Sequence, residues 1–177
     1  LHLSIRRQRQ MCIRDSNVGY MAVDELAGEL APVPGIKALV QVRDGVAYAR
    51  STTYMNTTGE AVGPLAKELG VTPERIIVVH DELDLPAGKV RVKLGGNENG
   101  HNGLKSITEH LGTRDYLRVR MGIGRPPQGM AVPDWVLSPI EGDISGQVAL
   151  AAKAVQLIVS EGLGKAQNVI LSLIHIS

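Results

Sequence analysis

Aromatic residues and cysteine are scarce in this chain, whose 177 residues include no Phe, one Trp, four Tyr and one Cys. The core must therefore be built from Val, Leu, Ile and Ala. No apolar run approaches the roughly 20 residues that a membrane-spanning helix needs, so we expect a soluble, cytoplasmic protein. The length fits one domain with a core of its own, and a hydrophobic content of 44% is ordinary for a globular protein.

The two ends of the chain are related at the nucleotide level. Residues 11–16, Met-Cys-Ile-Arg-Asp-Ser, can be encoded by ATGTGTATAAGAGACAG plus one base. The reverse complement of this stretch translates as Leu-Ser-Leu-Ile-His, which is the sequence of residues 171–175. A natural gene has no reason to begin and end in complementary strands of one oligonucleotide. We therefore interpret residues 1–16 and 171–177 as adapter-derived and residues 17–170 as the domain.

The alternative for the N-terminal segment is a basic targeting leader, which leaves the C-terminal match unexplained. Residues 1–16 hold four arginines and one aspartate, a net of +3, so without them the formal charge changes from +1 to −2. The basic pI then gives no indication of a nucleic-acid partner. The only cysteine, Cys12, lies in the same segment, so the sequence says nothing about disulfides.

Helical and strand-like patterns alternate along residues 17–170. The predicted helices cover residues 18–30, 59–69, 102–111 and 144–160, and the predicted strands cover 38–42, 46–51, 76–79, 89–94 and 116–123. Asp44-Gly45 suits the left-handed turn of a hairpin. The uninterrupted apolar run at 76–79 indicates a strand covered on both faces. Helices interleaved with strands predict a single α/β domain in which helices cover a sheet.

Three polar residues, Asn56, Asp81 and Asn102, each lie in a short segment next to an apolar, strand-like run. In an open α/β sheet such strand ends carry the functional groups. Two carboxamides and a carboxylate at these edges indicate a site that polarises a carbonyl and orients a base or a water molecule. They do not indicate a metal cage or a phosphate cradle.

Four motifs, in this order, resemble those of bacterial-type peptidyl-tRNA hydrolase: Thr-Thr-Tyr-Met-Asn-x-x-Gly (52–59), His-Asp-Glu-Leu-Asp-Leu-Pro (80–86), Gly-His-Asn-Gly-Leu (100–104) and Gly-Ile-Gly-Arg-Pro (122–126). The resemblance extends from residue 17 to residue 170. It implies a single domain with a mixed, mostly parallel sheet covered by helices on both faces. It also implies hydrolysis of the ester that joins a peptide to the 3′ ribose of tRNA, with no metal and no cofactor.

The family resemblance implies a role for each matching residue. In the family a histidine acts as general base on water and an aspartate orients it. Asp81 matches that aspartate, which fixes the imidazole tautomer and stabilises the imidazolium that forms. Asn56 and Asn102 match the residues that position water and substrate and donate to developing negative charge. Tyr54 is expected to line the groove beside the terminal nucleotide.

The same resemblance shows what the chain lacks. The match begins at Asn17, and Ser16 stands where the family has its catalytic histidine. We therefore expect a truncated fragment without the first strand and the general base, with little or no hydrolase activity. The lost strand should leave sheet edges unpaired and the core underfilled, which predicts low stability and aggregation. The second hypothesis is a tRNA- or RNA-binding pseudoenzyme that natively carries Ser16.

The histidines and glycines also allow simpler interpretations. His80 is consistent with a hydrogen-bonded histidine at a strand end, and His110 with a surface position. His101 is expected to support the loop before Asn102 rather than to replace the missing base. Residues 80–84 are too close in sequence to converge on a metal without a dedicated loop. The glycines at 95–103 lack the lysine and hydroxyl residue of a P-loop, so a flexible substrate loop is expected.

Basic residues give the best indication of the partner. Residues 89–125 contain eight Lys or Arg and three acidic residues. The period of two places Lys93 on one strand face with residues 89 and 91, and Arg120 on one face with residue 118. Solvated strand faces explain this spacing equally well. Together with the family resemblance, the spacing implies that Lys93 and Arg120 clamp the 5′-phosphate of peptidyl-tRNA. Nothing in the sequence demands an oligomer, so we expect a monomer.

Overall fold

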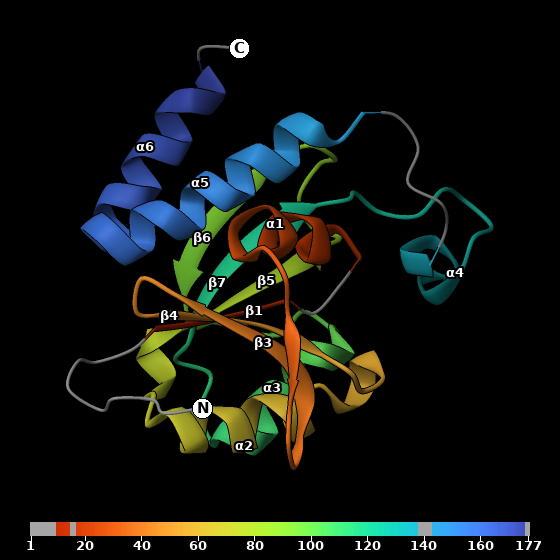
Figure 1. The fold of residues 1–177 in the computed structure, drawn as a ribbon. Helices are drawn as coiled ribbons and strands as arrows, with labels where there is room; N and C mark the ends of the chain where they lie inside the picture. Colours follow the sequence, from red (N-terminus) through yellow and green to blue (C-terminus); the bar gives the residue numbers. More distant parts are fainter. Residues whose placement is uncertain (1–9, 15–16, 138–142, 176–177) are drawn as a thin grey trace.

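A mixed sheet runs through the centre of the domain in the computed structural model, which describes residues 10–14, 17–137 and 143–175 (Figure 1). Its strands are β1 (Gln10–Arg14), β2 (Ala31–Val33), β3 (Ile36–Arg43), β4 (Val46–Ser51), β5 (Ile76–Glu82), β6 (Val90–Leu94) and β7 (Leu117–Gly122). The helices are α1 (Asn17–Ala27), α2 (Gly59–Leu69), α3 (Asn102–Leu111), α4 (Val132–Leu137), α5 (Ser145–Glu161) and α6 (Leu163–His175), with short 3-10 turns η1 (Met55–Thr57) and η2 (Pro73–Arg75).

The strands follow the order β2-β3-β4-β1-β5-β7-β6. The central strands β4, β1, β5 and β7 are parallel to one another, whereas β2, β3 and β6 add antiparallel pairs at the two edges. The predicted mixed sheet is thus confirmed. The described strands form three parallel and three antiparallel pairs, so the expectation of a mostly parallel sheet is too strong. The parallel strands nevertheless place their carboxyl ends at one edge.

A strand lies at the position where we expected the first strand of the family to be missing, whereas the expected truncation of the chain stays a prediction. Residues 10–14 form β1, which lies between β4 and β5, with Cys12 opposite Tyr48 on one side and Ile77 on the other. A central parallel strand is held mainly by backbone hydrogen bonds to both neighbours. Because the backbone of any non-proline residue can form these hydrogen bonds, a short segment directly before α1 can occupy the central position whatever its side chains are. The sheet interior is therefore continuous, and the predicted unpaired edges at this position are absent from the described strands.

Helices cover both faces of the sheet, as predicted (Figure 1). On one face α1, α5 and α6 pack over a core that includes Val23, Ile77, Val119 and Val155. On the other face α2 and α3 enclose a second core around Leu65 and its neighbours on β4 and β5. The cores consist mainly of Ala, Val, Leu and Ile, as the scarcity of aromatic residues requires. No helix within the described ranges is both long and apolar enough to cross a membrane.

Local turn chemistry explains the boundaries that match the sequence patterns. Asp44 and Gly45 both have positive φ, at 51° and 80°, and join β3 to β4 as a tight hairpin. Gly70 ends α2 in the left-handed conformation, with φ at 65°. The edge strand β2, the short helix α4 and the C-terminal helix α6 lie outside the predicted helices and strands.

The close contact between α2 and α3 leads to a testable prediction about stability. A Cβ at Gly59 would overlap the carbonyl oxygen of Ser106 and Nδ1 of His110. Gly59→Ala should therefore lower the free energy of unfolding by about 2–3 kcal/mol, measured by urea denaturation. Gly146→Ala is the matched control, because Gly146 lies in α5 with nothing within 4 Å of its added Cβ. Equal stability of the two variants would contradict the close packing.

Candidate functional site

The candidate site lies at the edge where the central parallel strands end. Asp81 is the next-to-last residue of β5, and its side chain is almost completely buried, with 5% of the residue exposed. The segment that follows β4 leads directly into η1, and η1 packs against α3. α3 begins beside the end of β5, because His101 contacts Asp81. This edge therefore brings together residues from three distant parts of the chain.

Two hydrogen bonds at this edge determine which nitrogen of His101 carries the proton. Nε2 of His101 lies 2.9 Å from Oδ1 of Asp81. Nδ1 of the same ring accepts a hydrogen bond from the backbone N–H of Leu104 at 3.2 Å, in an N-cap arrangement for α3. Since Nδ1 is an acceptor, the proton is on Nε2, which donates to the carboxylate. Burial is the largest single effect on the pKa of Asp81 and raises it. The hydrogen bond to His101 and the charges nearby act in the opposite direction, and together they lower the pKa of Asp81 below its ordinary value.

His80 is packed behind this pair. It is 1% exposed, and its Nδ1 lies 2.8 Å from the backbone oxygen of Asp81. Its Nε2 has no hydrogen-bond partner in the part of the chain that the structure describes, so the prediction of a hydrogen-bonded strand-end histidine is confirmed for only one of its two nitrogens. The ring lies edge-on to His101, with centroids 5.4 Å apart. Burial, followed by the charge of His101, lowers the pKa of His80 to about 3, so its imidazole is neutral at physiological pH.

Asn56 and Asn102 both lie at exposed positions. Asn56 is the middle residue of η1, whose turn is held by hydrogen bonds from the Thr57 and Thr58 hydroxyls to the backbone oxygens of Tyr54 and Met55. Asn102 is the first residue of α3, directly after His101. Tyr54 is 85% exposed. Both amides and the phenol are thus exposed at the surface.

A charged network lies on the neighbouring strands. Arg120 on β7 donates to Oε1 of Glu82 from Nε at 3.2 Å and from Nη2 at 3.0 Å. The same oxygen accepts from Nδ2 of Asn99 at 3.2 Å. Glu82 therefore ties together β5, β7 and the loop before α3. Lys93 lies on the same face of the sheet, and no acid is within ion-pair distance of it among the described residues.

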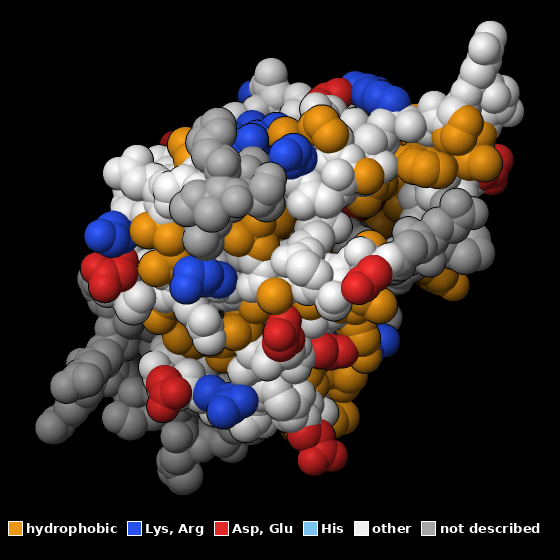
Figure 2. All heavy atoms as spheres, turned by 90° about the horizontal axis from the view of Figure 1, so that it is seen from above, with side chains coloured by type: hydrophobic (Ala, Val, Ile, Leu, Met, Phe, Trp, Pro, Cys, Tyr) orange, Lys and Arg blue, Asp and Glu red, His pale blue; other side chains and the backbone are white. Residues whose placement is uncertain are grey.

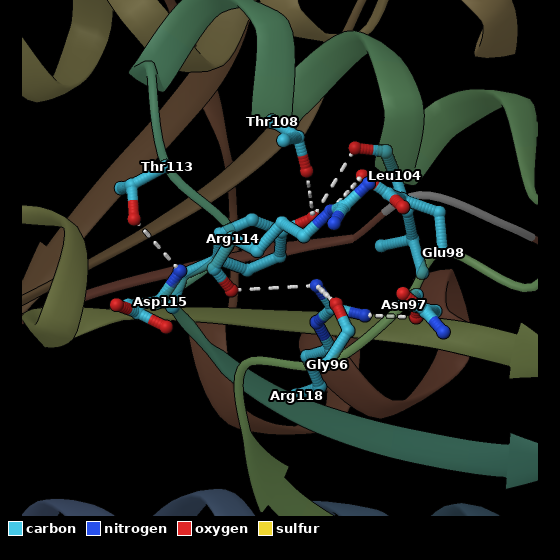
Figure 3. A network of polar contacts seen from close by, with 10 residues as sticks. Gly96, Asn97, Glu98, Leu104, Thr108, Thr113, Arg114, Asp115 and Arg118 are labelled. Carbon is cyan, nitrogen blue, oxygen red and sulfur yellow. Dashed lines mark hydrogen bonds and ion pairs between the residues drawn. The ribbon is translucent and has the colours of Figure 1, made fainter.

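The loop between β6 and α3 is held from below by a buried arginine (Figure 3). Arg118 is 1% exposed and donates from Nη1 to the carbonyl oxygen of Asn97 at 2.7 Å and from Nη2 to that of Gly96 at 2.9 Å. On the outer side Arg114 donates from Nε to Oε1 of Glu98 at 3.1 Å. These bonds tie the loop to β7 and to the segment before it, whereas the flexible substrate loop that the glycines predicted stays a prediction.

The opposite face of the molecule has a different surface. Seen from the side of α5 and α6, hydrophobic, basic and acidic side chains are interspersed (Figure 2). No area of one sign dominates that view. Within residues 10–14, 17–137 and 143–175, no three His, Cys, Asp or Glu side chains are grouped so that they could hold a metal ion.

Comparison with known proteins decides the family. The family model for peptidyl-tRNA hydrolase matches residues 13–173. The chain belongs to the peptidyl-tRNA hydrolase family. It is 61% identical to peptidyl-tRNA hydrolase 2 of Corynebacterium glutamicum over 162 residues, covering 88% of this chain and 79% of that protein. It is 47% identical to the peptidyl-tRNA hydrolase of Cutibacterium acnes, covering 86% of this chain and 87% of that protein.

Solved structures agree with this assignment. The crystal structure of peptidyl-tRNA hydrolase from Acinetobacter baumannii aligns with a TM-score of 0.80 at 27% identity, covering 96% of both chains. The predicted family, its α/β fold and its hydrolase class are therefore confirmed. The sequence patterns singled out Asp81, whose role stays a prediction, but missed the contacts of Glu82 and Arg118. Their long-range partners, 38 and 21 residues away, could not be found from spacing. Ser16 lies outside the described residues.

The buried His80 makes stability depend on pH in this peptidyl-tRNA hydrolase fold. Its imidazole is neutral in the folded protein, with a pKa of about 3, whereas the unfolded chain binds a proton below the ordinary value of 6.5. The free energy of unfolding should therefore fall as the pH is lowered from 6.5 towards 3, by up to about 1.4 kcal/mol per unit. Urea denaturation between pH 7 and pH 5 measures this slope.

His80→Gln provides the comparison, because it retains polarity without the titration. Every other residue is the same in both proteins, so the difference between the two slopes belongs to residue 80. We expect the variant to lose the decline that His80 causes. Identical slopes would show that His80 is not held neutral by burial.

Proposed function

We propose that the Asp81–His101 edge is the ester-binding end of a peptidyl-tRNA site. There Asn56 and Asn102 position the acyl carbonyl and the attacking water, and Tyr54 lies beside the terminal nucleotide. The reaction is hydrolysis of the bond between a peptide and the 3′ ribose of tRNA, which frees the tRNA for reuse. We further propose that the protein acts as a cytoplasmic monomer. The observation that carries the proposal is the buried carboxylate of Asp81, bonded to His101 directly beside Asn102.

His101 is not suited to act as the general base. Its Nε2 carries the proton that Asp81 accepts, and its Nδ1 accepts the N–H of Leu104. Neither nitrogen has a free lone pair to take a proton from water. We infer that His101 positions Asp81 and Asn102, and that the base is the histidine that the family has at residue 16. Oδ2 of Asp81 supplies the acceptor that would orient such an imidazole.

Restoring this base should restore turnover. Ser16→His is expected to raise the rate of N-acetyl-aminoacyl-tRNA hydrolysis by at least about 100-fold, since a positioned general base contributes about 10²–10⁴. The rate is followed by the release of free tRNA under single-turnover conditions. The control is Ser16→His combined with Asp81→Asn, which keeps the imidazole but alters the carboxylate that orients it.

Two outcomes would oppose the assignment. Family-like turnover by the chain with Ser16 would show that another group is the base. Binding of tRNA without turnover, both in the chain with Ser16 and in the Ser16→His variant, would favour the second candidate, a tRNA-binding pseudoenzyme. That candidate is supported by the hydrogen bonds at both nitrogens of His101, which leave this histidine without a free lone pair to act as a base.

The second half of the proposal is an anion site at Lys93 and Arg120. Burial, followed by the charges of Arg120 and Arg118, lowers the pKa of Lys93, whereas Glu82 raises it. These three cations lie on one face, and Glu82 pairs directly with only Arg120. A phosphate group would reduce the repulsion between them. We infer that this face binds the 5′-phosphate of tRNA, a contact that carries no sequence information.

Lys93→Gln tests this contact without leaving a buried acid unpaired. It should weaken tRNA binding about tenfold and reduce by about one the slope of log affinity against log salt concentration. Fluorescence anisotropy with labelled tRNA, between about 50 and 200 mM salt, measures both quantities. The control is Lys153→Gln, because Lys153 is exposed on α5 across the sheet. An unchanged salt slope in Lys93→Gln would exclude Lys93 from the phosphate contact.

A further inference from the structure

The loop of residues 95–100 connects the two ends of the proposed substrate site. It begins directly after β6, which carries Lys93, and ends directly before His101 and Asn102. Its conformation therefore sets the spacing between the proposed phosphate contact and the proposed ester contact. A shift of this loop would move the two ends relative to each other.

The loop cannot hold this conformation by local preference alone. Four of its six residues, Gly95, Gly96, Asn99 and Gly100, have positive φ, between 53° and 98°. Glycine populates these conformations readily but is also free to leave them. The loop must therefore be fixed by contacts from outside, and Arg118 supplies two of them from beneath.

Arg118 reaches the loop from the middle of the sheet. Its guanidinium donates to two consecutive loop carbonyls, at Gly96 and Asn97, and Nη2 also lies 3.4 Å from the carbonyl oxygen of Arg114 (Figure 3). No acid forms an ion pair with it among the described residues. A buried cation held by backbone carbonyls orders those carbonyls, because each lost bond would leave charge uncompensated.

Contacts at Gly96 link this clamp to Lys93. A Cβ at Gly96 would lie 2.8 Å from Nζ of Lys93, so the lysine side chain runs closely over the glycine whose carbonyl Arg118 holds. Farther along the loop, Glu98 accepts the backbone N–H of His101 through its carbonyl oxygen at 2.9 Å. The Arg118 contacts thus lie between the proposed phosphate-binding lysine and the start of α3.

We propose that Arg118 is a positioning residue that fixes the distance between the phosphate-binding and ester-binding ends of the tRNA site by clamping the carbonyl oxygens of Gly96 and Asn97. This inference rests on the proposed function for the identity of the two ends. Arg118 is buried beneath the loop, opposite Lys93 on the adjacent strand, and we assign it no direct contact with the substrate.

Arg118→Lys tests the clamp, since a lysine retains the charge but lacks the planar fork that reaches two carbonyls. Two readouts are compared with the native chain. Hydrogen exchange of the amides at 96–102 should become at least about tenfold faster. The gain in affinity that a 5′-phosphate gives to a tRNA acceptor-stem minihelix should shrink about fivefold, measured by anisotropy with phosphorylated and unphosphorylated minihelices.

Arg91→Lys is the matched control. Arg91 lies on the adjacent strand, opposite Arg120, and its guanidinium donates to the backbone oxygen of Val90 rather than to the loop. This variant should leave both readouts unchanged. If Arg118→Lys does not fold, Gly96→Ala perturbs the same loop from its exposed side, because its φ of 98° disfavours a Cβ and the added atom crowds Lys93. It should reduce the phosphate gain in the same way.

The outcomes separate this inference from the proposed function. Native-like exchange and native-like phosphate gain in Arg118→Lys would overturn the positioning role. If the native chain shows no phosphate gain, the phosphate assignment fails, and the exchange experiment alone decides whether Arg118 orders the loop. Equal exchange in Arg118→Lys and Arg91→Lys would then overturn the inference.

Discussion

The hydrogen bond between His101 and Asp81 joins the end of β5 to the start of α3, and the site is organised around it. It is formed by a buried carboxylate and an imidazole whose other nitrogen caps the helix. Because both ring nitrogens are engaged, the tautomer and ring orientation are fixed. Asn102 follows as the first residue of α3, and its position depends on the same contact. The bond thereby couples the packing of a helix on a sheet to the geometry of Asp81 and Asn102, the two groups proposed to act on the substrate.

Much of the fold could be predicted from sequence because its boundaries depend on local chemistry. The ends of α2 and of the β3–β4 hairpin coincide with glycines or an Asp-Gly pair in left-handed conformations. The buried run at 76–79 lies in β5, which is covered on both faces. Such features involve few residues, close in sequence, and do not depend on tertiary packing. The same reasoning placed Asp81 at a strand end without identifying its partner.

Other features depend on pairings that no local pattern encodes. β1 is a strand because β4 and β5 offer it backbone partners on both sides, and β2 is a strand because residues 31–33 lie along β3. Glu82 could not be distinguished from a solvated acid, although it is buried and pairs with an arginine 38 residues away. Nothing in the sequence distinguished Lys93 from Arg120 as phosphate-binding residues. Only the structure shows that Arg120 is already neutralised by Glu82, whereas Lys93 has no such acid among the described residues.

This difference between the two cations has a consequence for the site. A guanidinium held by Glu82 through Nε and Nη2 is fixed in orientation before any ligand arrives, so little conformational entropy is lost when it meets an anion. Lys93 lacks such a partner in the described structure and retains its attraction for a phosphate, at the cost of repulsion from Arg118 and Arg120. Glu82 also binds Asn99, so the acid that orients Arg120 anchors the far end of the loop whose first half Arg118 holds. One loop with two anchors, one acidic and one basic, is therefore sufficient to keep the cationic strand face and the start of α3 in register.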